Sequence, residues 1–364
     1  ASDNRANREE RLMGTPLSRR WFLTATGGVC AGGILSGPAA AQEDIIYFRI
    51  GTGSTGGTYF PIGGIIANAI SNPPGSRPCE LGGSCGVPGL IAIVQSTQGS
   101  IQNVKDIDAM RLESGFVQAD VAYWAYSGER MFQAGGPVRS LRVIASLYPE
   151  AVHIVVRGDS GIKSVADLRG KRVGVGEPDS GTQVHARVVL GAHGLGPNTV
   201  RESHEKPSSA ADALRDGKID AFFVVTGEPA AVITTLADAM PISLLPVADK
   251  SVDRVLTRFP FFTRHTIPAG TYKGVAQIET ISVMAQWLVS ATVDATLVYG
   301  ITKALWSANT RRQLDRGHPE GRRITLATAR EGVILPLHPG AERYYREAKI
   351  PAKAPEKTPS EKGG

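Results

Sequence analysis

The stretch that decides the fold reads IIYFRIGTGSTGGTYFPIGG over residues 45–64. Its apolar start, from Ile45 to Ile50, predicts a buried strand. A turn rich in Gly, Ser and Thr follows, and the residues from Pro61 to Ile70 predict a helix, which the next Pro-Pro-Gly run ends. A strand, a glycine-rich turn and a helix in this order are typical of an α/β unit.

The same alternation of strand and helix continues along the chain and forms two β-α-β-α-β units in tandem. Such units predict parallel sheets that helices cover. The stretch from Ile278 to Asn309 is apolar and is expected to be helical. Further strands are expected over residues 90–95, 115–118, 172–176, 200–204 and 219–225, and further helices over 101–110, 120–126, 180–193 and 208–216.

The chain has 364 residues, and domains of about 150 residues are common, so two domains are expected. We predict an α/β fold of two lobes, each a mainly parallel sheet flanked by helices, which form a clamshell around a ligand cleft. The expected boundaries are 42–147 for the first part of lobe I, 148–248 for lobe II and 249–348 for the return into lobe I. The tail, 349–364, is rich in Pro, Lys, Glu, Ser and Gly and is expected to be disordered.

Composition and charge exclude several classes of protein. Hydrophobic residues make up 42% of the chain and charged residues 20%, which excludes an intrinsically disordered protein. The formal net charge is +6, but the basic residues are scattered, without the aromatic-interleaved stripe that follows a phosphate backbone, so no nucleic-acid partner is expected. No apolar stretch of 18 or more residues suggests a membrane span.

The N-terminal region is interpreted as an export signal. Residues 18–24, SRRWFLT, match a twin-arginine motif, and a moderately apolar segment leads to a small-residue cleavage pattern that ends at Ala41. Residues 1–41 are therefore predicted to be a signal peptide, with the mature protein in the periplasm. A mobile N-terminal helix is the alternative.

Cleavage would remove Cys30 and leave Cys79 and Cys85, which flank a short glycine-rich loop. A disulfide between these two cysteines is expected in an oxidising compartment, where it would stiffen a surface excursion. A zinc site is less expected, because no His or further Cys lies nearby.

The loop from Gly51 to Gly56 has three interpretations. It matches the G-x-G-x-x-G dinucleotide fingerprint, but the next strand ends at Gln95 and Ser96, without the carboxylate that would bind a ribose. Backbone N–H groups and nearby hydroxyls would alternatively hold a small anion. Simple turn formation is the third interpretation. The candidate ligand contacts here are Thr52, Gly53, Ser54, Thr55, Thr58 and Tyr59.

Further candidates follow the carboxyl ends of other predicted strands, where α/β sheets place ligands. Ser180 and Gln183 match a capping box, so Ser180 either caps its helix only or contacts a ligand with the help of its neighbours. Glu228 is either a ligand contact or a solvated loop residue, and Tyr148 lies either in the cleft or in the core. The candidates in these segments are Thr97, Gln118, Tyr148, Ser180, Gly181, Thr182, Thr226 and Glu228.

Sequence patterns for catalysis are missing. The seven histidines have no H-x-x-x-H or H-E-x-x-H spacing, so no metal site is expected. No G-x-S-x-G nucleophile motif occurs, and the two remaining cysteines are expected to be paired. The protein is therefore predicted to be neither an enzyme nor a cofactor carrier.

At several segments the chain resembles the TAXI-type solute receptors of TRAP transporters. The matching segments run in order over most of residues 45–340, and the first is the most specific. They read IGTGSTGGTYFPIG (50–63), GFVQADVAY (115–123), LYPE (147–150), SGIKSVADLRGK (160–171) and DGKIDAFF (216–223).

The resemblance implies a type II periplasmic binding fold that closes on a small organic carboxylate, such as glutamate or 2-oxoglutarate, and presents it to a TRAP membrane permease. A monomer without cofactor is expected. Glu228 and the Cys79–Cys85 loop depart from the family pattern, and Glu228 stands where a neutral or basic residue is expected. The resemblance assigns binding to Gly53, Ser54, Thr55, Thr58, Tyr59, Gln118, Ser180, Gly181 and Thr182.

Two other functions stay open. An exported dinucleotide-dependent oxidoreductase would use the Gly51–Gly56 loop, and twin-arginine export, which suits proteins folded with a cofactor, favours it. A receptor of the same fold would alternatively report its ligand to a sensor kinase. The choice of carboxylate, the affinity, the coupling ion and the permease are not defined by these motifs.

Overall fold

A computed structural model describes residues 44–351. The predicted signal peptide with Cys30, and the tail from residue 352 onward, lie outside the described residues. Within the described part, no helix is both long and apolar enough to cross a bilayer.

The first parallel group of strands is formed as the sequence predicts. Strand β1 (Ile46–Gly51) lies between β4 (Leu90–Gln95) and β5 (Ser114–Gln118), and both pairings are parallel. These three strands are called the β1 group. The helices that follow them in the chain are α1 (Tyr59–Ile70), α2 (Ser100–Asp108) and α3 (Ala119–Ser127).

The second parallel group repeats this plan. Strand β7 (Arg172–Gly174) lies between β9 (Ala221–Thr226) and β8 (Arg201–Ser203), again in parallel. These three strands are called the β9 group. The helices here are α4 (Gly181–Ala192), α5 (Pro207–Arg215) and α6 (Ala231–Ala239). The fold is therefore α/β, with parallel strand groups flanked by helices, as predicted.

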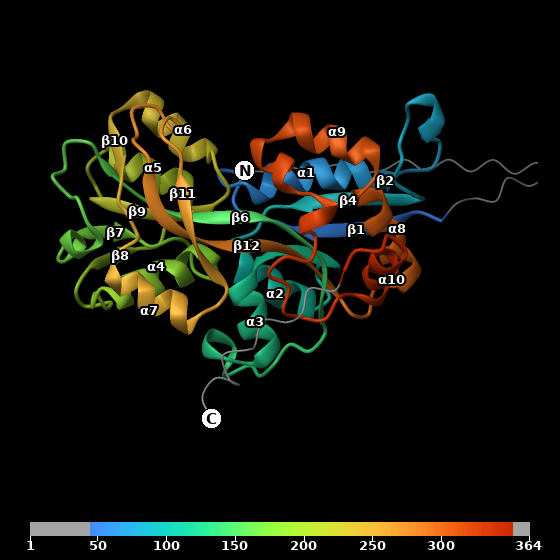
Figure 1. The fold of residues 1–364 in the computed structure, drawn as a ribbon, viewed down its shortest axis with the longest axis horizontal. Helices are drawn as coiled ribbons and strands as arrows, with labels where there is room; N and C mark the ends of the chain where they lie inside the picture. The colour runs from blue at the N-terminus through green and yellow to red at the C-terminus, as the bar shows by residue number, and fades with distance from the viewer. Residues whose placement is uncertain (1–43, 352–364) are drawn as a thin grey trace, which may run out of the picture. The chain divides into compact units, whose positions relative to one another are not determined.

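Two long antiparallel strands join the groups into one sheet (Figure 1). Strand β12 (Ile278–Ser290) pairs with β5, strand β6 (Leu141–Arg157) pairs with β9, and β12 and β6 pair with each other. The order is β4-β1-β5-β12-β6-β9-β7-β8, with β10 (Ile242–Leu244) on β6 and β11 (Phe262–Ile267) on β12. The expected lobe boundary at 147/148 falls inside β6.

The prediction of a helix from Ile278 to Asn309 is wrong for its first part, which is strand β12. Most of β12 is buried, on both faces of the sheet, so its apolar run lacks the alternation that marks a half-exposed strand. Helix α8 (Ala295–Leu305) and the start of α9 (Ala308–Gly317) match the rest of the predicted helix.

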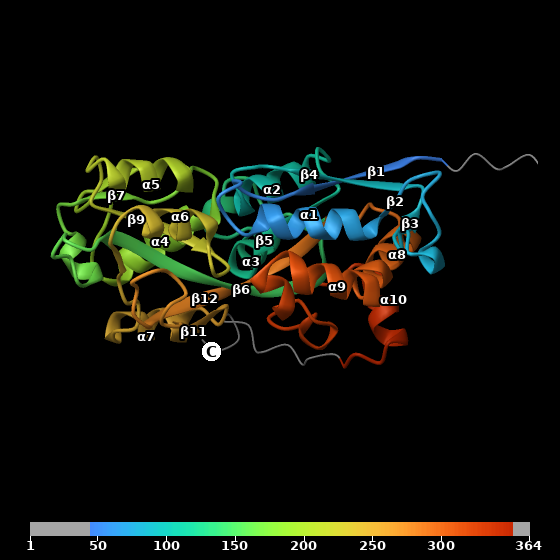
Figure 2. The same cartoon turned by 90° about the horizontal axis from the view of Figure 1, so that it is seen from above.

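The C-terminal part returns to the β1 group. Helices α8 and α9 contact α1, and α10 (Pro339–Glu347) contacts α8 (Figure 2). The core beneath them includes Trp287 of β12, whose ring meets Phe48 and Phe116 edge-on. The remaining elements are α7 (Lys250–Arg258), the short strands β2 (Ser71–Asn72) and β3 (Val87–Pro88), and 3-10 turns at Cys79–Leu81, Arg130–Phe132, Val165–Leu168, Pro319–Arg323 and Leu326–Thr328.

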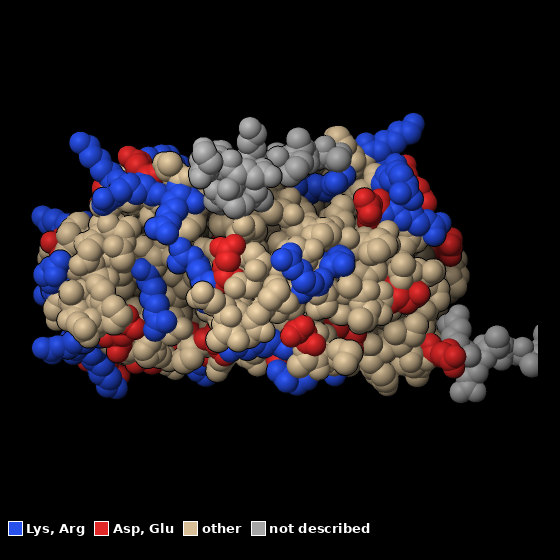
Figure 3. All heavy atoms as spheres, turned by 90° about the horizontal axis from the view of Figure 1, so that it is seen from below, with Lys and Arg blue, Asp and Glu red and all other residues tan. Residues whose placement is uncertain are grey.

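Charges of both signs are interspersed over the face drawn in Figure 3. Lys and Arg side chains are most frequent toward the left end of the view.

The predicted disulfide between Cys79 and Cys85 is present, at the excursion between β2 and β3. We expect the double substitution of both cysteines with serine to lower the free energy of unfolding by at most about 2 kcal/mol, because the closed loop is short. Ligand affinity should not change, because neither cysteine lines the cavity described below. Urea unfolding and a binding titration of the double variant test this, and a large loss of affinity would contradict it.

Candidate functional site

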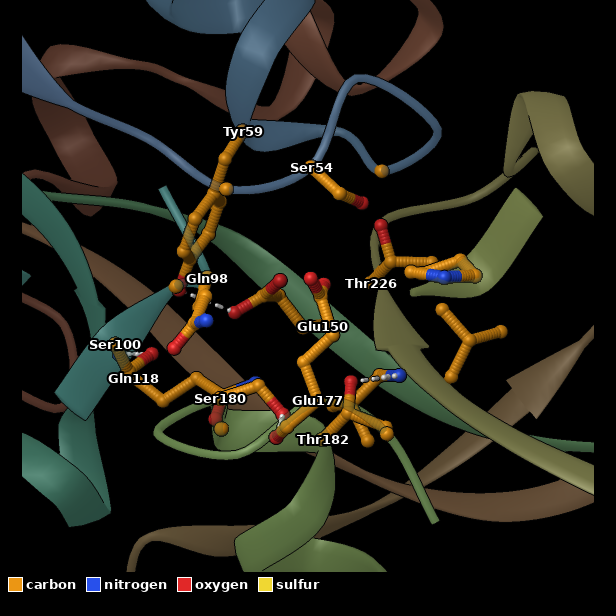
Figure 4. Close-up of a pocket in the computed structure, with 18 of the residues that line it drawn as sticks. Ser54, Tyr59, Gln98, Ser100, Gln118, Glu150, Glu177, Ser180, Thr182 and Thr226 are labelled. Carbon is orange, nitrogen blue, oxygen red and sulfur yellow. Dashed lines mark hydrogen bonds between the residues drawn. The ribbon is translucent and has the colours of Figure 1, made fainter. Parts of the chain in front are cut away.

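A cavity lies where the carboxyl ends of the β1 group face those of the β9 group (Figure 4). The volume open to the centre of a water molecule is about 60 Å³, about four times what one buried water needs. In this conformation the cavity therefore suits a small ligand. Its lining comprises Gly53, Ser54, Gly57, Thr58, Tyr59, Gln98, Gly99, Ser100, Gln118, Glu150, Gly176, Glu177, Ser180, Gly181, Thr182, Pro207, Val224, Val225 and Thr226.

The fold explains why these residues meet. Parallel strands end at the same edge of a sheet, so the turns after β1, β4 and β5 lie together, as do those after β7 and β9. Most of the residues predicted for ligand binding line this cavity: Gly53, Ser54, Thr58, Tyr59, Gln118, Ser180, Gly181, Thr182 and Thr226.

Three predicted residues lie outside the cavity but close to it. Thr52 is buried, and its hydroxyl donates to the carbonyl of Gln95 at 2.8 Å, which ties β1 to β4. Thr55 and Thr97 line an adjoining polar recess that also contains Lys206. The Thr97 hydroxyl lies 2.7 Å from the side-chain oxygen of Asn103 and 2.9 Å from the carbonyl of Thr52.

Tyr148 and Glu228 also lie outside the cavity lining. Tyr148 is fully buried in the core cluster around Trp287, which agrees with the core alternative. Glu228 is buried, so the solvated alternative is wrong. Its Oε1 lies 3.1 Å from His265 Nε2 and 3.4 Å from Arg323 Nη2. Neither side chain is placed to contact a ligand in the cavity.

Sequence reasoning missed several lining residues, including Gln98, Ser100, Glu150 and Glu177. Gln98 and Ser100 lie in the polar turn that supplied Thr97, and Glu177 lies just before the predicted Ser180 turn. Glu150 gave a different signal, since it is a carboxylate within a long run of mostly buried residues, strand β6. An ionisable group in such a run indicates a functional role or an internal partner.

Direct contacts bridge the two groups at one side of the cavity. The backbone N–H of Thr58, just before α1, donates to the hydroxyl of Thr226 at 3.0 Å, and the Thr58 hydroxyl donates to the carbonyl of Gly227 at 3.1 Å. Both threonines are 2% exposed. We call this contact the threonine bridge.

A second contact joins the groups through Asp179, in the turn before α4. Its carbonyl accepts hydrogen bonds from the N–H groups of Ile101 and Gln102 at 3.1 and 3.2 Å, so it caps the N-terminus of α2. Its carboxylate pairs with Lys105 Nζ at 2.6 Å. Asp179 has a positive φ of 62°, a region in which Asp is more common than most residues.

The N-terminus of α4 also faces the cavity. The Ser180 hydroxyl accepts from the N–H of Gln183 at 3.1 Å, so Ser180 caps the helix as predicted. The reciprocal bond of the predicted capping box is not formed, because the Gln183 side chain lies against His204 and the Ser180 N–H donates to the carbonyl of Glu177. The first N–H groups of a helix have no acceptor within the helix, and the helix dipole favours negative charge there. The backbone at Gly181 and Thr182 therefore suits an anionic or carbonyl oxygen.

The floor of the cavity contains a buried carboxyl group, Glu150, which is 2% exposed. The Tyr59 hydroxyl donates to its Oε2 at 2.7 Å, as Figure 4 shows. Burial raises the pKa of Glu150 to about 8, although hydrogen bonds from Tyr59 and Gln118 oppose the rise. Burial also raises the pKa of Glu177, and the positive charge of Lys206 opposes that rise.

A polar cluster lies behind the cavity and joins β9 to the C-terminal part. Glu320 accepts a hydrogen bond from the backbone N–H of Glu228 at 3.1 Å, and Arg323 Nε lies 3.6 Å from the second Glu320 oxygen. Burial raises the pKa of Glu320 to about 7. This cluster holds the segment after β9 against the turn Pro319–Arg323.

Within residues 44–351, no group of three or more His, Cys, Asp or Glu side chains is placed to hold a metal ion. The arrangement is a small polar pocket, rich in hydroxyl and amide groups, between two halves of a sheet. Its chemistry suits reversible binding of a small polar molecule.

Comparisons with known proteins match one family and a set of solved structures. The sequence profile of the NMT1-like family matches residues 50–348. Among solved structures, the alkanesulfonate-binding protein SsuA from Xanthomonas axonopodis pv. citri is 16% identical, with 85% of each chain covered and a TM-score of 0.44. The periplasmic aliphatic sulphonate binding protein SsuA from Escherichia coli is 15% identical, with 84% of this chain and 89% of that chain covered and a TM-score of 0.41.

A protein from Bordetella bronchiseptica RB50 is 16% identical, with 84% of this chain and 82% of that chain covered and a TM-score of 0.48. At these identities and TM-scores, the likeness does not extend to a ligand or an activity.

Proposed function

The chain belongs to the NMT1-like family, and on that premise we propose that it is a periplasmic solute-binding receptor that delivers a small organic carboxylate to a membrane permease of the TRAP type. The observation that carries this proposal is the cavity itself. Its lining comes from the strand ends of both groups, and the threonine bridge and Asp179 join the groups beside it. A ligand held there contacts both groups, so its binding favours the arrangement in which they meet.

Two features support a carboxylate as part of the ligand. The N-terminus of α4 offers N–H groups and a favourable dipole at Gly181 and Thr182. The hydroxyls of Ser54, Ser100 and Thr226 add polar contacts around the same space. The TAXI-type resemblance described above points to the same class of ligand.

The dinucleotide alternative has less support. In dinucleotide-binding folds, an acidic residue at the end of the strand next to the glycine loop binds the ribose of the cofactor. Here Gln95 is the residue paired beside Gly51, at the end of β4. Thr58, at the end of the same loop, is occupied by the threonine bridge.

A thermal-shift screen of residues 42–364 tests the receptor function. The panel contains small carboxylates, amino acids, sugars and nicotinamide nucleotides, and the protein is first unfolded and refolded to remove any bound solute. A ligand at a thousand times its Kd adds about 4 kcal/mol to the native state, which is readily seen. Stabilisation by carboxylates supports the proposal, whereas stabilisation by nucleotides alone would replace it with the oxidoreductase.

Substitution of Thr226 with valine tests the threonine bridge. We expect ligand affinity to fall roughly tenfold, because the buried Thr58 N–H loses its acceptor when the groups meet, at a cost of about 1–3 kcal/mol. Isothermal titration measures the change. Thr257→Val is the control, because Thr257 is exposed on α7 and its hydroxyl contacts only its own helix. If Thr226→Val binds the ligand as tightly as Thr257→Val does, the threonine bridge has no role in ligand binding.

A further inference from the structure

The charges of the cavity do not match a ligand that carries only negative charge. Among the described residues that line it, two have carboxyl side chains, Glu150 on the floor and Glu177, and none is Lys, Arg or His. Lys206 lies in the adjoining recess, beside Glu177.

Glu150 has no cationic partner among the residues described around it. The charged groups that act on it are the acidic Asp120 and Glu320. Asp120 pairs with His185 at 2.8 Å, and Arg323 lies against Glu228 and Glu320. Arg323 is therefore engaged by other carboxylates, and Glu150 faces the cavity with hydrogen bonds from the Tyr59 hydroxyl and the Gln118 side chain.

A second, independent feature lies beside Glu150. The side-chain oxygen of Gln118 is buried and has no hydrogen-bond partner among the described residues, while Gln118 as a whole is 2% exposed. It lies against the first residue of α4, since a Cβ built on Gly181 would be 1.7 Å from it. A buried acceptor without a donor is costly, so the site is completed by a group that donates hydrogen bonds.

We propose that Glu150 and the side-chain oxygen of Gln118 receive a protonated amine of the ligand, so that Glu150 determines specificity for ammonium-bearing carboxylates over carboxylates without nitrogen. This rests on the proposed receptor function. The ammonium group is the cationic partner that Glu150 lacks and the hydrogen-bond donor that the Gln118 oxygen lacks. The N-terminus of α4, next to Gln118, then receives the carboxylate of the same molecule.

The proposal also predicts that a proton is released when the ligand binds. Burial keeps Glu150 largely protonated at pH 7 in the unliganded protein, because its pKa is raised to about 8. An ammonium group stabilises the carboxylate form, so the proton leaves the site on binding. A ligand without a cationic nitrogen gives no such release.

The test compares ligands that differ in the amine alone. L-alanine with propionate, L-glutamate with glutarate, and γ-aminobutyrate with butyrate are titrated into refolded residues 42–364 at pH 7, in buffers of different ionisation enthalpy. We expect at least one amine-bearing member to bind at least tenfold more tightly than its partner and to release a proton. In Glu150→Gln this preference and the proton release should disappear, while the fold is retained. Glu331→Gln, on the surface, should behave as the parent protein.

The outcomes separate this inference from the receptor function. If the plain carboxylates bind as tightly as their amine partners, or if Glu150→Gln keeps the preference, the role of Glu150 is refuted while the receptor function stands. Binding of putrescine without any carboxylate would support the amine contact and refute the carboxylate. If the folded protein binds no member of the panel, both the carboxylate function and this inference are refuted.

Discussion

Replacement of Gly181 with valine should reduce ligand affinity at least about a hundredfold and leave the fold intact. A Cβ at this position would lie 1.7 Å from the side-chain oxygen of Gln118 and 2.5 Å from its Cδ. Gln118 is almost fully buried, so its side chain can move only into the cavity or together with the surrounding groups. Either movement removes the ligand space or separates the two groups. The loss corresponds to about 3 kcal/mol or more of binding free energy.

Gly191→Ala, on the same helix, is the matched control. A Cβ on the exposed Gly191 would meet nothing within 4 Å, so we expect affinity within about threefold of the parent protein. Both variants should keep the far-UV spectrum of the parent, because Gly181 and Gly191 both lie in α4 without a positive φ, whereas the clash with Gln118 should lower the thermal midpoint of Gly181→Val. Isothermal titration of the two variants decides the matter, and near-normal affinity in Gly181→Val would exclude the N-terminus of α4 from the site.

Local pattern was enough to predict both parallel groups. Strand β4 has the expected bounds, Leu90–Gln95, and β1, β5, β7, β8 and β9 lie within a few residues of their predicted positions. Each of these strands is short and is followed by a polar turn and a periodic helix, so its ends are marked in the sequence itself. Because parallel strands bring such turns to one edge, the sequence also predicts most of the cavity lining.

The antiparallel connection and the charge of the cavity could not be predicted in this way. Strands β6 and β12 pair with partners far away in the sequence, and their long buried runs do not distinguish strand from helix. Glu150 lies in the middle of β6, two residues after the candidate Tyr148 in the LYPE segment, and no turn or strand end marks it in the sequence. The resulting site is acidic where an anion-binding motif suggested the opposite, since the distribution of charge around a cavity depends on tertiary contacts.

Glu150→Gln should change how the stability of the protein depends on pH. The pKa of Glu150 is about 8 in the folded protein, against an ordinary value of 4.5. Between these two pH values the folded state keeps a proton that the unfolded state has lost, so the free energy of unfolding falls as pH rises through this window. The contribution of protonated Glu150 to the free energy of unfolding is complete below pH 4.5 and lost above pH 8. Each pH unit between these values lowers the free energy of unfolding by about 1.4 kcal/mol.

Glutamine has no proton to lose and keeps the shape that accepts the Tyr59 hydroxyl. We therefore expect Glu150→Gln to have nearly the stability of the parent protein near pH 4.5 and to be more stable by roughly 2–5 kcal/mol near pH 8.5. Glu320, whose pKa is also raised, is present in both proteins, and its repulsion of the Glu150 carboxylate is part of the difference that the comparison measures. Urea unfolding at the two pH values, without ligand and with Glu331→Gln as the surface control, measures the difference. A variant that gains nothing at high pH would mean that Glu150 is already ionised and compensated in the folded protein, which would also remove the need for a ligand cation beside it.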